Sequence, residues 1–222
     1  MVTTLQKLHQ LPFFAQLDED ALRDIAPYIQ ERTFALGQVV ISEREPCQAV
    51  YFVVQGLVRT RRLSMDGREQ VLAYLGPGEP FNLVPALDGG SNLATVDAVT
   101  ETTLYTIPCR RFHLILRDHH PVALAVLERL AAEVRRLSDM VEDLALYTVR
   151  TRLARFLLAH AESTPLSQRR WTQEEIAAQI GTVREMVGRT LRAFAMAGLI
   201  RRQRGRIILV DREGLECEAT GG

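Results

Sequence analysis

The chain lacks the residue patterns on which most metal, disulfide and catalytic sites depend. Its three cysteines, Cys47, Cys109 and Cys217, lie far apart, with no CxxC pair and no Cys/His cluster at zinc spacing. The five histidines form no HxH or HExxH pattern, and no GxSxG or Walker motif is present. The sequence therefore predicts neither a structural metal nor a disulfide framework, and it does not indicate an enzyme.

Long hydrophobic runs are also missing. No apolar stretch approaches the roughly 20 residues that span a bilayer. The short segment LPFFAQL near the N-terminus has no basic region or small-residue cleavage site. With 222 residues, 47% of them hydrophobic and 24% charged, the chain has room for one large or two modest globular domains. We expect a cytoplasmic protein with no membrane partner.

The chain has no net charge, because 27 basic residues balance 27 acidic residues. The balance is uneven along the sequence. Residues 149–222 hold 13 arginines against 8 carboxylates, a net charge of +5, whereas residues 1–148 hold 14 basic against 19 acidic residues, a net charge of −5. This asymmetry favours a polyanionic partner at the C-terminal third only.

Short β-like segments follow a predicted helix over about 18–30. The segments AVYFVVQ, LVRTRRL, EQVLAYL, ATVDAVT and TTLYTI are rich in Val, Thr, Tyr and Leu, and glycine- or proline-containing turns separate them. Asp66-Gly67 is the strongest hairpin signal among these turns. Strands of this length and spacing predict an antiparallel sandwich or barrel.

From Pro121 the pattern becomes helical. Apolar residues recur there in alternating steps of three and four between charged flanks: Leu127, Leu130, Val134, Leu137, Val141 and Leu144. Packing on the chain's own β domain would also need an apolar stripe, but a stripe two positions wide favours a parallel partner helix. We therefore predict a homodimer that forms along this seam.

The C-terminal region carries two similar helix-start signals after an amphipathic helix over 148–162. Thr172 and Thr182 are each followed three residues later by a glutamate, which is the capping-box pattern. These signals predict a helix over 173–180, a turn at Gly181, a helix over 183–197 and a basic hairpin that turns at 204–205. Two helices joined by a glycine turn and followed by such a hairpin indicate a winged helix-turn-helix.

The second predicted helix is amphipathic with an arginine-rich polar face. At about 100° per residue this face holds Arg184, Glu185, Gly188, Arg189 and Arg192, opposite an apolar face. Exposed helix faces are often charged for solubility alone. In a helix-turn-helix, however, the N-terminal residues of the second helix contact base edges in the major groove. The motif therefore favours DNA as the partner of this face.

The order of these features resembles the cyclic AMP receptor protein and FNR superfamily of bacterial transcription regulators. The resemblance covers nearly the whole chain and is most specific in GQVVISEREPCQAVYFVVQGLVRTRRLSMDGREQVLAYLGPGEPF and TQEEIAAQIGTVREMVGRTLRAFAMAGLI. It implies an α+β fold with RNA polymerase as a further partner. The implied parts are an N-terminal double-stranded β-helix, a jelly-roll-like β-roll for an effector, over 1–120, a dimerisation helix and hinge over 121–147, and a winged helix-turn-helix over 148–222.

Within the second predicted helix, REMVGR resembles the cyclic AMP receptor version of the motif. Carried over, Arg184, Glu185 and Arg189 would contact the bases of a TGTGA-like half-site in an inverted repeat. Arginine suits guanine O6 and N7, and glutamate accepts from cytosine N4. A capping role for Glu185 stays an alternative. The expected contacts to the DNA backbone are Thr172, Gln173, Thr182, Arg192 and Arg204.

The effector domain departs from the family pattern. Cyclic-nucleotide binders carry a Gly-Glu pair for the ribose and an Arg-Ser or Arg-Thr pair for the cyclic phosphate. The departing positions are Asn82 and Leu83 in place of Gly-Glu, Asn92 and Leu93 in place of the arginine pair, and Leu137 beside a retained Ser138 on the dimerisation helix. Without the arginine a buried phosphate would be unpaired, which costs several kcal/mol. We therefore expect neither cAMP nor cGMP as the effector.

The identity of any other effector stays open. The substitutions make the pocket more apolar, which would suit haem, an aromatic or fatty ligand, or filling by the protein's own side chains. An iron-sulfur cluster needs four cysteines and is excluded by their number, and a thiol sensor at Cys47 or Cys109 lacks a partner nearby in sequence. In a haem-based gas sensor four histidines could ligate iron, although the segment RDHHP looks like a solvated turn: His9, His113, His119 and His120.

Two other classes of protein share the β topology. A nucleotide-sensing regulatory module without DNA binding would not need the winged helix. A cupin-like metalloenzyme would need a His/Glu cluster on the strands, and the sequence has none. The sequence thus predicts a homodimeric, sequence-specific DNA-binding transcription regulator that needs no effector or responds to a ligand other than a cyclic nucleotide.

Overall fold

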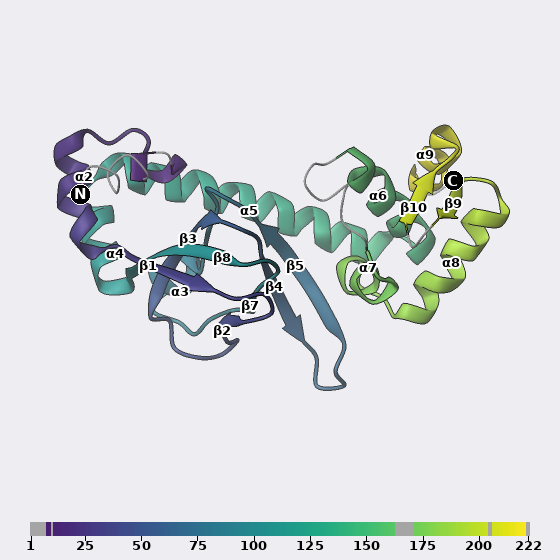
Figure 1. The fold of residues 1–222 in the computed structure, drawn as a ribbon, viewed down its shortest axis with the longest axis horizontal. Helices are drawn as coiled ribbons and strands as arrows, with labels where there is room; N and C mark the ends of the chain where they lie inside the picture. Colours follow the sequence, from purple (N-terminus) through teal and green to yellow (C-terminus); the bar gives the residue numbers. More distant parts are fainter. Residues whose placement is uncertain (1–7, 10, 163–170, 204–205, 221–222) are drawn as a thin grey trace. The chain divides into compact units, whose positions relative to one another are not determined.

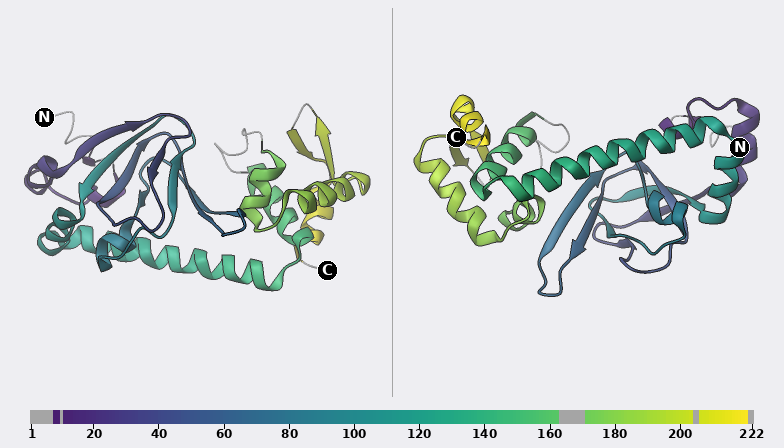
Figure 2. Two further views of the ribbon diagram at one scale, coloured as in Figure 1. Left: turned by 90° about the horizontal axis from the view of Figure 1, so that it is seen from below. Right: turned by 180° about the vertical axis from the view of Figure 1, so that it is seen from behind.

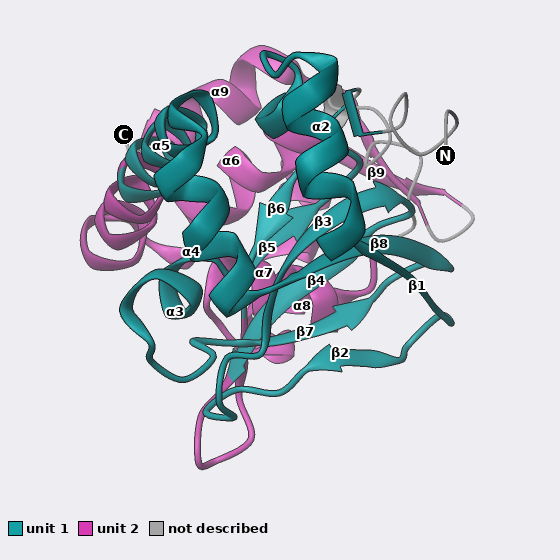
Figure 3. Ribbon diagram, turned by 90° about the vertical axis from the view of Figure 1, so that its left-hand side faces the viewer, with its two compact units in different colours: residues 1–62, 71–134 teal, residues 63–70, 135–222 magenta. Residues whose placement is uncertain are grey.

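The computed structural model describes residues 8–9, 11–162, 171–203 and 206–220. The chain divides into two compact units (Figure 3). Unit 1 comprises residues 1–62 and 71–134, and unit 2 comprises residues 63–70 and 135–222.

Unit 1 contains two four-stranded sheets, except for the tip of the hairpin over 63–70, which is assigned to unit 2 (Figure 1). In spatial order, the first sheet consists of β1 (Gln30–Phe34), β8 (Thr102–Pro108), β3 (Ala49–Gln55) and β6 (Pro80–Phe81). The second consists of β2 (Val39–Ile41), β7 (Thr95–Ala98), β4 (Val58–Leu63) and β5 (Glu69–Leu75). Apolar side chains of both sheets form a shared core: Tyr51, Val53, Val58, Leu75, Phe81, Val96 and Leu104. The predicted β architecture is confirmed.

The predicted helix over 18–30 is wrong in its second half. The helix α2 spans only Glu19–Ile25, after Asp18 at its N-cap, and a short 3-10 turn, η2, follows over Ala26–Tyr28. Pro27 explains the early end, because proline donates no backbone hydrogen bond to continue the helix. The chain is therefore free to enter β1 immediately afterwards.

A second core of unit 1 lies between the first sheet and a set of helices. The 3-10 turn η1 (Pro12–Phe14) places the Phe14 ring 5.3 Å from that of Phe52 on β3. The remaining helices that contribute buried residues are α2, α3 (Leu83–Asp88), α4 (Cys109–Asp118) and the start of α5 (His120–Leu146). The segment RDHHP lies at the junction of α4 and α5, where Arg117, Asp118 and His120 are exposed, as expected for the solvated segment that the sequence indicates.

Gly56 joins β3 to β4 and tolerates no side chain. Its φ is +94°, and a Cβ there would lie 2.4 Å from the Glu101 carbonyl oxygen and 2.6 Å from Thr102 Oγ1. We expect Gly56→Ala to lower the free energy of unfolding by about 2–4 kcal/mol, measured by urea denaturation. Gly37→Ala is the matched control, because Gly37 has a φ of +79° but no atom within 4 Å of its Cβ position. An equal loss in both variants would contradict the steric argument.

Unit 2 contains the C-terminal helices and a hairpin, which can be followed in Figure 2. Its elements after α5 are α6 (Val149–Glu162), α7 (Gln173–Ile180), α8 (Arg184–Met196), β9 (Ile200–Gln203), β10 (Arg206–Leu209) and α9 (Arg212–Thr220). The strands β9 and β10 pair antiparallel, as predicted for the wing. The turn at 204–205, with Arg204, lies outside the described residues.

Candidate DNA-binding surface and effector region

The helix-turn-helix begins with a complete capping box at α7. Thr172 Oγ1 accepts a hydrogen bond of 3.1 Å from the Glu175 backbone N–H, and Glu175 Oε2 accepts one of 2.8 Å from the Thr172 N–H. Gly181 ends α7 with a left-handed φ of +65°, a conformation that costs glycine little. The first capping-box prediction is confirmed, and these contacts fix where the turn to α8 begins.

The second predicted capping box is wrong. The N-cap of α8 is Val183, whose side chain makes no capping hydrogen bond. The Thr182 N–H instead donates to the Ala177 carbonyl oxygen at 2.9 Å, so Thr182 completes the end of α7. Glu185 is consequently not folded back onto Thr182: its Oε1 accepts a 3.1 Å hydrogen bond from Arg189 Nη2.

The polar face of α8 is exposed in the structure. Arg184, Glu185, Arg189 and Arg192 are all exposed. The opposite face is buried in the core of unit 2 through residues that include Val187, Leu191 and Phe194. The amphipathic helix therefore presents three arginines and one glutamate to solvent on the side away from its own core.

Gly188 departs from its predicted position on the exposed face. The residue is buried, and a Cβ there would lie 2.8 Å from Gln173 Oε1. Glycine at this position thus allows α8 to approach the first residue of α7 closely. The contact brings Gln173, a predicted DNA-backbone residue, next to the exposed face of α8.

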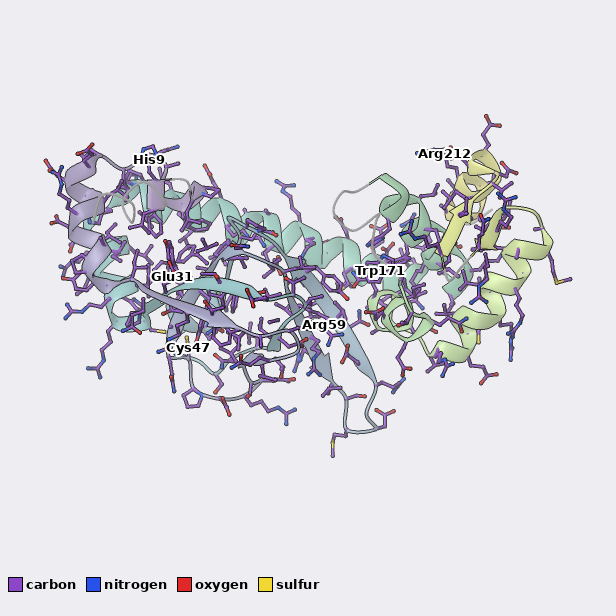
Figure 4. The ribbon with its side chains drawn as sticks, viewed as in Figure 1. His9, Glu31, Cys47, Arg59, Trp171 and Arg212 are labelled. Atoms are coloured by element: carbon purple, nitrogen blue, oxygen red, sulfur yellow. The ribbon has the colours of Figure 1, made fainter. Side chains whose placement is uncertain are left out.

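A groove of about 590 Å³ lies between the starts of the two helices and the wing. Its lining includes Gln173, Glu174 and Arg184 from the helices and Arg202 and Arg206 from the wing strands. Three of these five side chains are positively charged. Trp171, labelled in Figure 4, also lines the groove next to the N-cap of α7. The site is therefore a concave, mainly basic surface beside the exposed arginines of α8.

The apolar seam of α5 is largely exposed within one chain. Leu127, Val134 and Val141 have exposed fractions of 62%, 67% and 65%, and Leu137 and Leu144 are 40% and 43% exposed. Leu130 differs, because it packs partly against the core of unit 1. Leu130 thus packs partly inside unit 1, while the other five seam positions form an apolar stripe that is exposed to solvent in one chain.

The structure brings together the two asparagines that depart from the family pattern. Asn82 Nδ2 donates to Asn92 Oδ1 at 3.0 Å and to the Ala49 carbonyl oxygen at 3.1 Å. Asn92, only 5% exposed, donates from Nδ2 to the Ser42 carbonyl oxygen at 3.0 Å. Leu83 is buried beside them, whereas Leu93 is exposed. Leu137 and Ser138 are exposed on α5.

Two further groupings of residues in unit 1 were not predicted from the sequence, although Cys47 and Cys109 were each considered as a thiol sensor without a partner nearby in sequence. Asp97 on β7 accepts from Arg61 Nε at 2.6 Å and from Arg59 Nη2 at 3.0 Å on the neighbouring strand β4. Cys47 and Cys109 place their Sγ atoms 3.0 Å apart. Figure 4 labels Arg59 and Cys47. The alternating arginines of VRTRRL were a weak signal for the first group, and nothing in the local sequence indicates the second.

The candidate haem ligands have separate surroundings. His113 Nε2 forms a 2.6 Å hydrogen bond with the Ala86 carbonyl oxygen of α3. His9 is exposed, and His119 and His120 lie at the junction of α4 and α5. Within the described part of the chain, no group of three or more His, Cys, Asp or Glu residues could hold a metal ion. No described helix is long and apolar enough to cross a membrane.

Comparison with known proteins agrees with both halves of this architecture. Residues 31–119 match the cyclic nucleotide-binding domain family, and residues 151–218 match the Crp-like helix-turn-helix domain. The chain is 34% identical over 213 residues to the cyclic AMP receptor protein of Thermus thermophilus, covering 95% of this chain and 97% of that protein. It is 28% identical over 213 residues to a CRP-like cAMP-activated global transcriptional regulator of Mycobacterium tuberculosis, covering 93% and 95%.

Among solved structures, a putative transcriptional regulator of the CRP/FNR family from Eubacterium rectale matches with a TM-score of 0.79 and 25% identity, covering 94% of this chain and 98% of the other. The chain belongs to the CRP/FNR family of transcription regulators. It is thus a DNA-binding transcription regulator and not an enzyme, which confirms the predicted class and α+β fold.

Proposed function

We propose that the chain acts as a cytoplasmic homodimer that reads a TGTGA-like inverted repeat and contacts RNA polymerase. The observation that carries this proposal is the exposed polar face of α8 beside the basic groove. The proposed base contacts are Arg184, Glu185 and Arg189, and the proposed backbone contacts are Thr172, Gln173, Thr182, Arg192 and Arg204.

In the protein without DNA, only a weak ion pair restrains two of the proposed base-contacting side chains. Arg189 and Glu185 form an ion pair four residues apart, with side chains 65% and 77% exposed. Such an exposed pair contributes about 0.3–0.5 kcal/mol, whereas a good bidentate contact between an arginine and a base contributes about 1–3 kcal/mol of discrimination. The base contact is worth more than the ion pair that it replaces, so both side chains are available to the major groove. Glu185 does not cap α8 through Thr182, so the alternative structural role considered for it does not compete with base reading.

The exposed stripe on α5 supports the dimer. Five of the six seam positions are at least 40% exposed in one chain, and burial against a second copy would remove this apolar surface from water. We propose that residues 121–147 form the dimerisation helix and hinge between a β-roll domain over 1–120 and a DNA-binding domain over 148–222. Two recognition helices would then face the two halves of an inverted repeat.

The effector region supports regulation without a cyclic nucleotide. Both relatives compared above are described by name as cAMP proteins, but Asn82 and Asn92 offer no cation to a cyclic phosphate and satisfy one another instead. We propose that the chain needs no effector, or responds to a ligand other than cAMP or cGMP. Haem stays the alternative. His113 Nε2 is hydrogen-bonded to the Ala86 carbonyl oxygen, so iron would have to bind at Nδ1 of this ring.

The test is fluorescence anisotropy of the purified protein on a TGTGA inverted repeat and on a scrambled duplex at about 0.15 M salt. We expect tight, specific binding with nothing added and no change on addition of cAMP. Strong binding only after cAMP is added would contradict the proposed effector independence. An absorption spectrum of the same sample distinguishes co-purified haem, whose Soret band would favour the gas-sensor alternative.

A further inference from the structure

Two cysteines that are 62 positions apart in sequence meet in unit 1. Cys47 precedes β3, and Cys109 is the first residue of α4, directly after β8. The antiparallel register of these strands pairs Ala49 with Pro108, and the Cys109 N–H donates to the Gln48 carbonyl oxygen at 3.1 Å. The backbone of the sheet therefore holds the two thiols together at the ends of its two inner strands, with a Sγ–Sγ separation of 3.0 Å.

This arrangement needs only a small change to become a disulfide. The S–S bond is about 2.05 Å long, so the sulfur atoms must approach by about 1 Å. Both thiols are free and half-buried, which leaves them open to a small reagent. The third cysteine, Cys217, is exposed on α9 in unit 2.

We propose that Cys47 and Cys109 form a dithiol site that a low-molecular-weight disulfide, RSSR, oxidises reversibly to an intramolecular disulfide. The Cys109 thiolate attacks one sulfur of RSSR, which forms a mixed disulfide and releases RS⁻. The Cys47 thiolate then attacks Sγ of Cys109, which forms the internal bond and releases the second RS⁻. The two protons lost by the cysteines end on the two released thiols, so two protein thiols are oxidised and one RSSR is reduced to two RSH.

The surroundings of the two sulfurs set the order of attack. Burial, together with the adjacent Cys109 thiol, raises the pKa of Cys47 to about 12, so Cys47 stays protonated at neutral pH. Cys109, the first residue of the ten-residue helix α4, is therefore the thiol that attacks RSSR first. Once Cys109 carries the mixed disulfide, its thiol no longer raises the pKa of Cys47. The second attack therefore becomes easier only after the first has occurred.

The dithiol contacts the two asparagines of the effector region. Asn82 Nδ2 lies 3.3 Å from Cys47 Sγ, in addition to its contacts with the Ala49 carbonyl oxygen and Asn92 Oδ1. An amide nitrogen carries two hydrogens, so three acceptors compete for them. Movement of the Cys47 sulfur toward Cys109 would release Asn82 to its other two acceptors. The oxidation state of the two cysteines would thus change the hydrogen bonds of Asn82 and Asn92, which stand where cyclic-nucleotide binders of the family contact the effector.

Thiol counting on the full-length chain tests the chemistry without DNA. The protein is incubated with oxidised glutathione, denatured, and its free thiols are counted. We expect the count to fall from three to one with a mass loss of two hydrogens, and dithiothreitol to restore it. Cys217→Ser should still form the bond, whereas Cys47→Ser and Cys109→Ser should give only glutathione adducts. Because Cys217 is exposed and can form adducts of its own, the deciding sample is Cys217→Ser. Two free thiols, or a stable glutathione adduct, in oxidised Cys217→Ser would overturn the proposal.

The DNA readout rests on the function proposed above and is separable from the chemistry. Anisotropy titrations compare the dithiol and disulfide forms on the inverted repeat. We expect their dissociation constants to differ by at least about fivefold in the wild type and in Cys217→Ser. Cys47→Ser cannot form the bond, so its dissociation constant should be the same with and without dithiothreitol. Equal constants would overturn the regulatory link. Absence of specific DNA binding in both forms would contradict the proposed function while the thiol counts still decide the disulfide.

Discussion

Val134→Asp is expected to convert the proposed dimer into monomers. Val134 lies in the middle of the exposed stripe and is 67% exposed in one chain, so the aspartate costs a monomer little. In a parallel dimer the two aspartates would face one another across the seam, where burying unpaired like charges costs several kcal/mol. Sedimentation equilibrium should therefore give the 25.0 kDa mass of one chain rather than twice that mass.

The same variant should lose affinity for the inverted repeat. A monomer contacts one half-site, so the second binding event is no longer intramolecular, and affinity should fall by about 100-fold or more. Leu63→Asp is the matched control, because Leu63 is 52% exposed and lies outside the stripe. It should leave the dimer and its DNA affinity intact. If Val134→Asp remained dimeric, the prediction that the dimer forms along the apolar stripe of α5 would be wrong.

Local chemistry made much of the fold predictable. The segments AVYFVVQ and EQVLAYL coincide with β3 and β5, and the capping box at Thr172 places the start of α7 correctly. In each case the signal lies within a few neighbouring residues. The strand β1 escaped prediction for the opposite reason, because QERTF is polar and mostly exposed and has no alternation to detect.

Details of the DNA-binding surface and the effector region could not be predicted where one residue can belong to either of two helices, or where residues distant in sequence come into contact. Thr182 matches a capping box in sequence, but its N–H completes the end of α7, so Val183 becomes the N-cap of α8. Cys47 and Cys109 meet only because β3 pairs with β8, a long-range register that single-sequence patterns do not contain. Gly188 faces Gln173 for a similar reason, since the packing of α7 on α8 decides its exposure.

Arg189→Ala is expected to weaken binding to the TGTGA repeat by about 1–3 kcal/mol per half-site and to relax specificity at one G·C position. The fold should be unchanged, because Arg189 is exposed and its bond to Glu185 is an exposed pair. The measurement is anisotropy on the repeat and on duplexes substituted at each half-site position. A uniform loss across all of these duplexes would contradict base reading by Arg189.

Arg206→Ala is the matched control on the wing, because Arg206 lines the groove but lies outside the recognition helix. A contact to phosphate carries no sequence information, so this variant should weaken binding to specific and scrambled duplexes alike and reduce the salt slope by about 1. The two arginines carry the same charge, so loss of general electrostatic attraction would affect both variants equally. Position-dependent loss in Arg189→Ala alone therefore separates hydrogen bonding to a base edge from attraction to the DNA backbone.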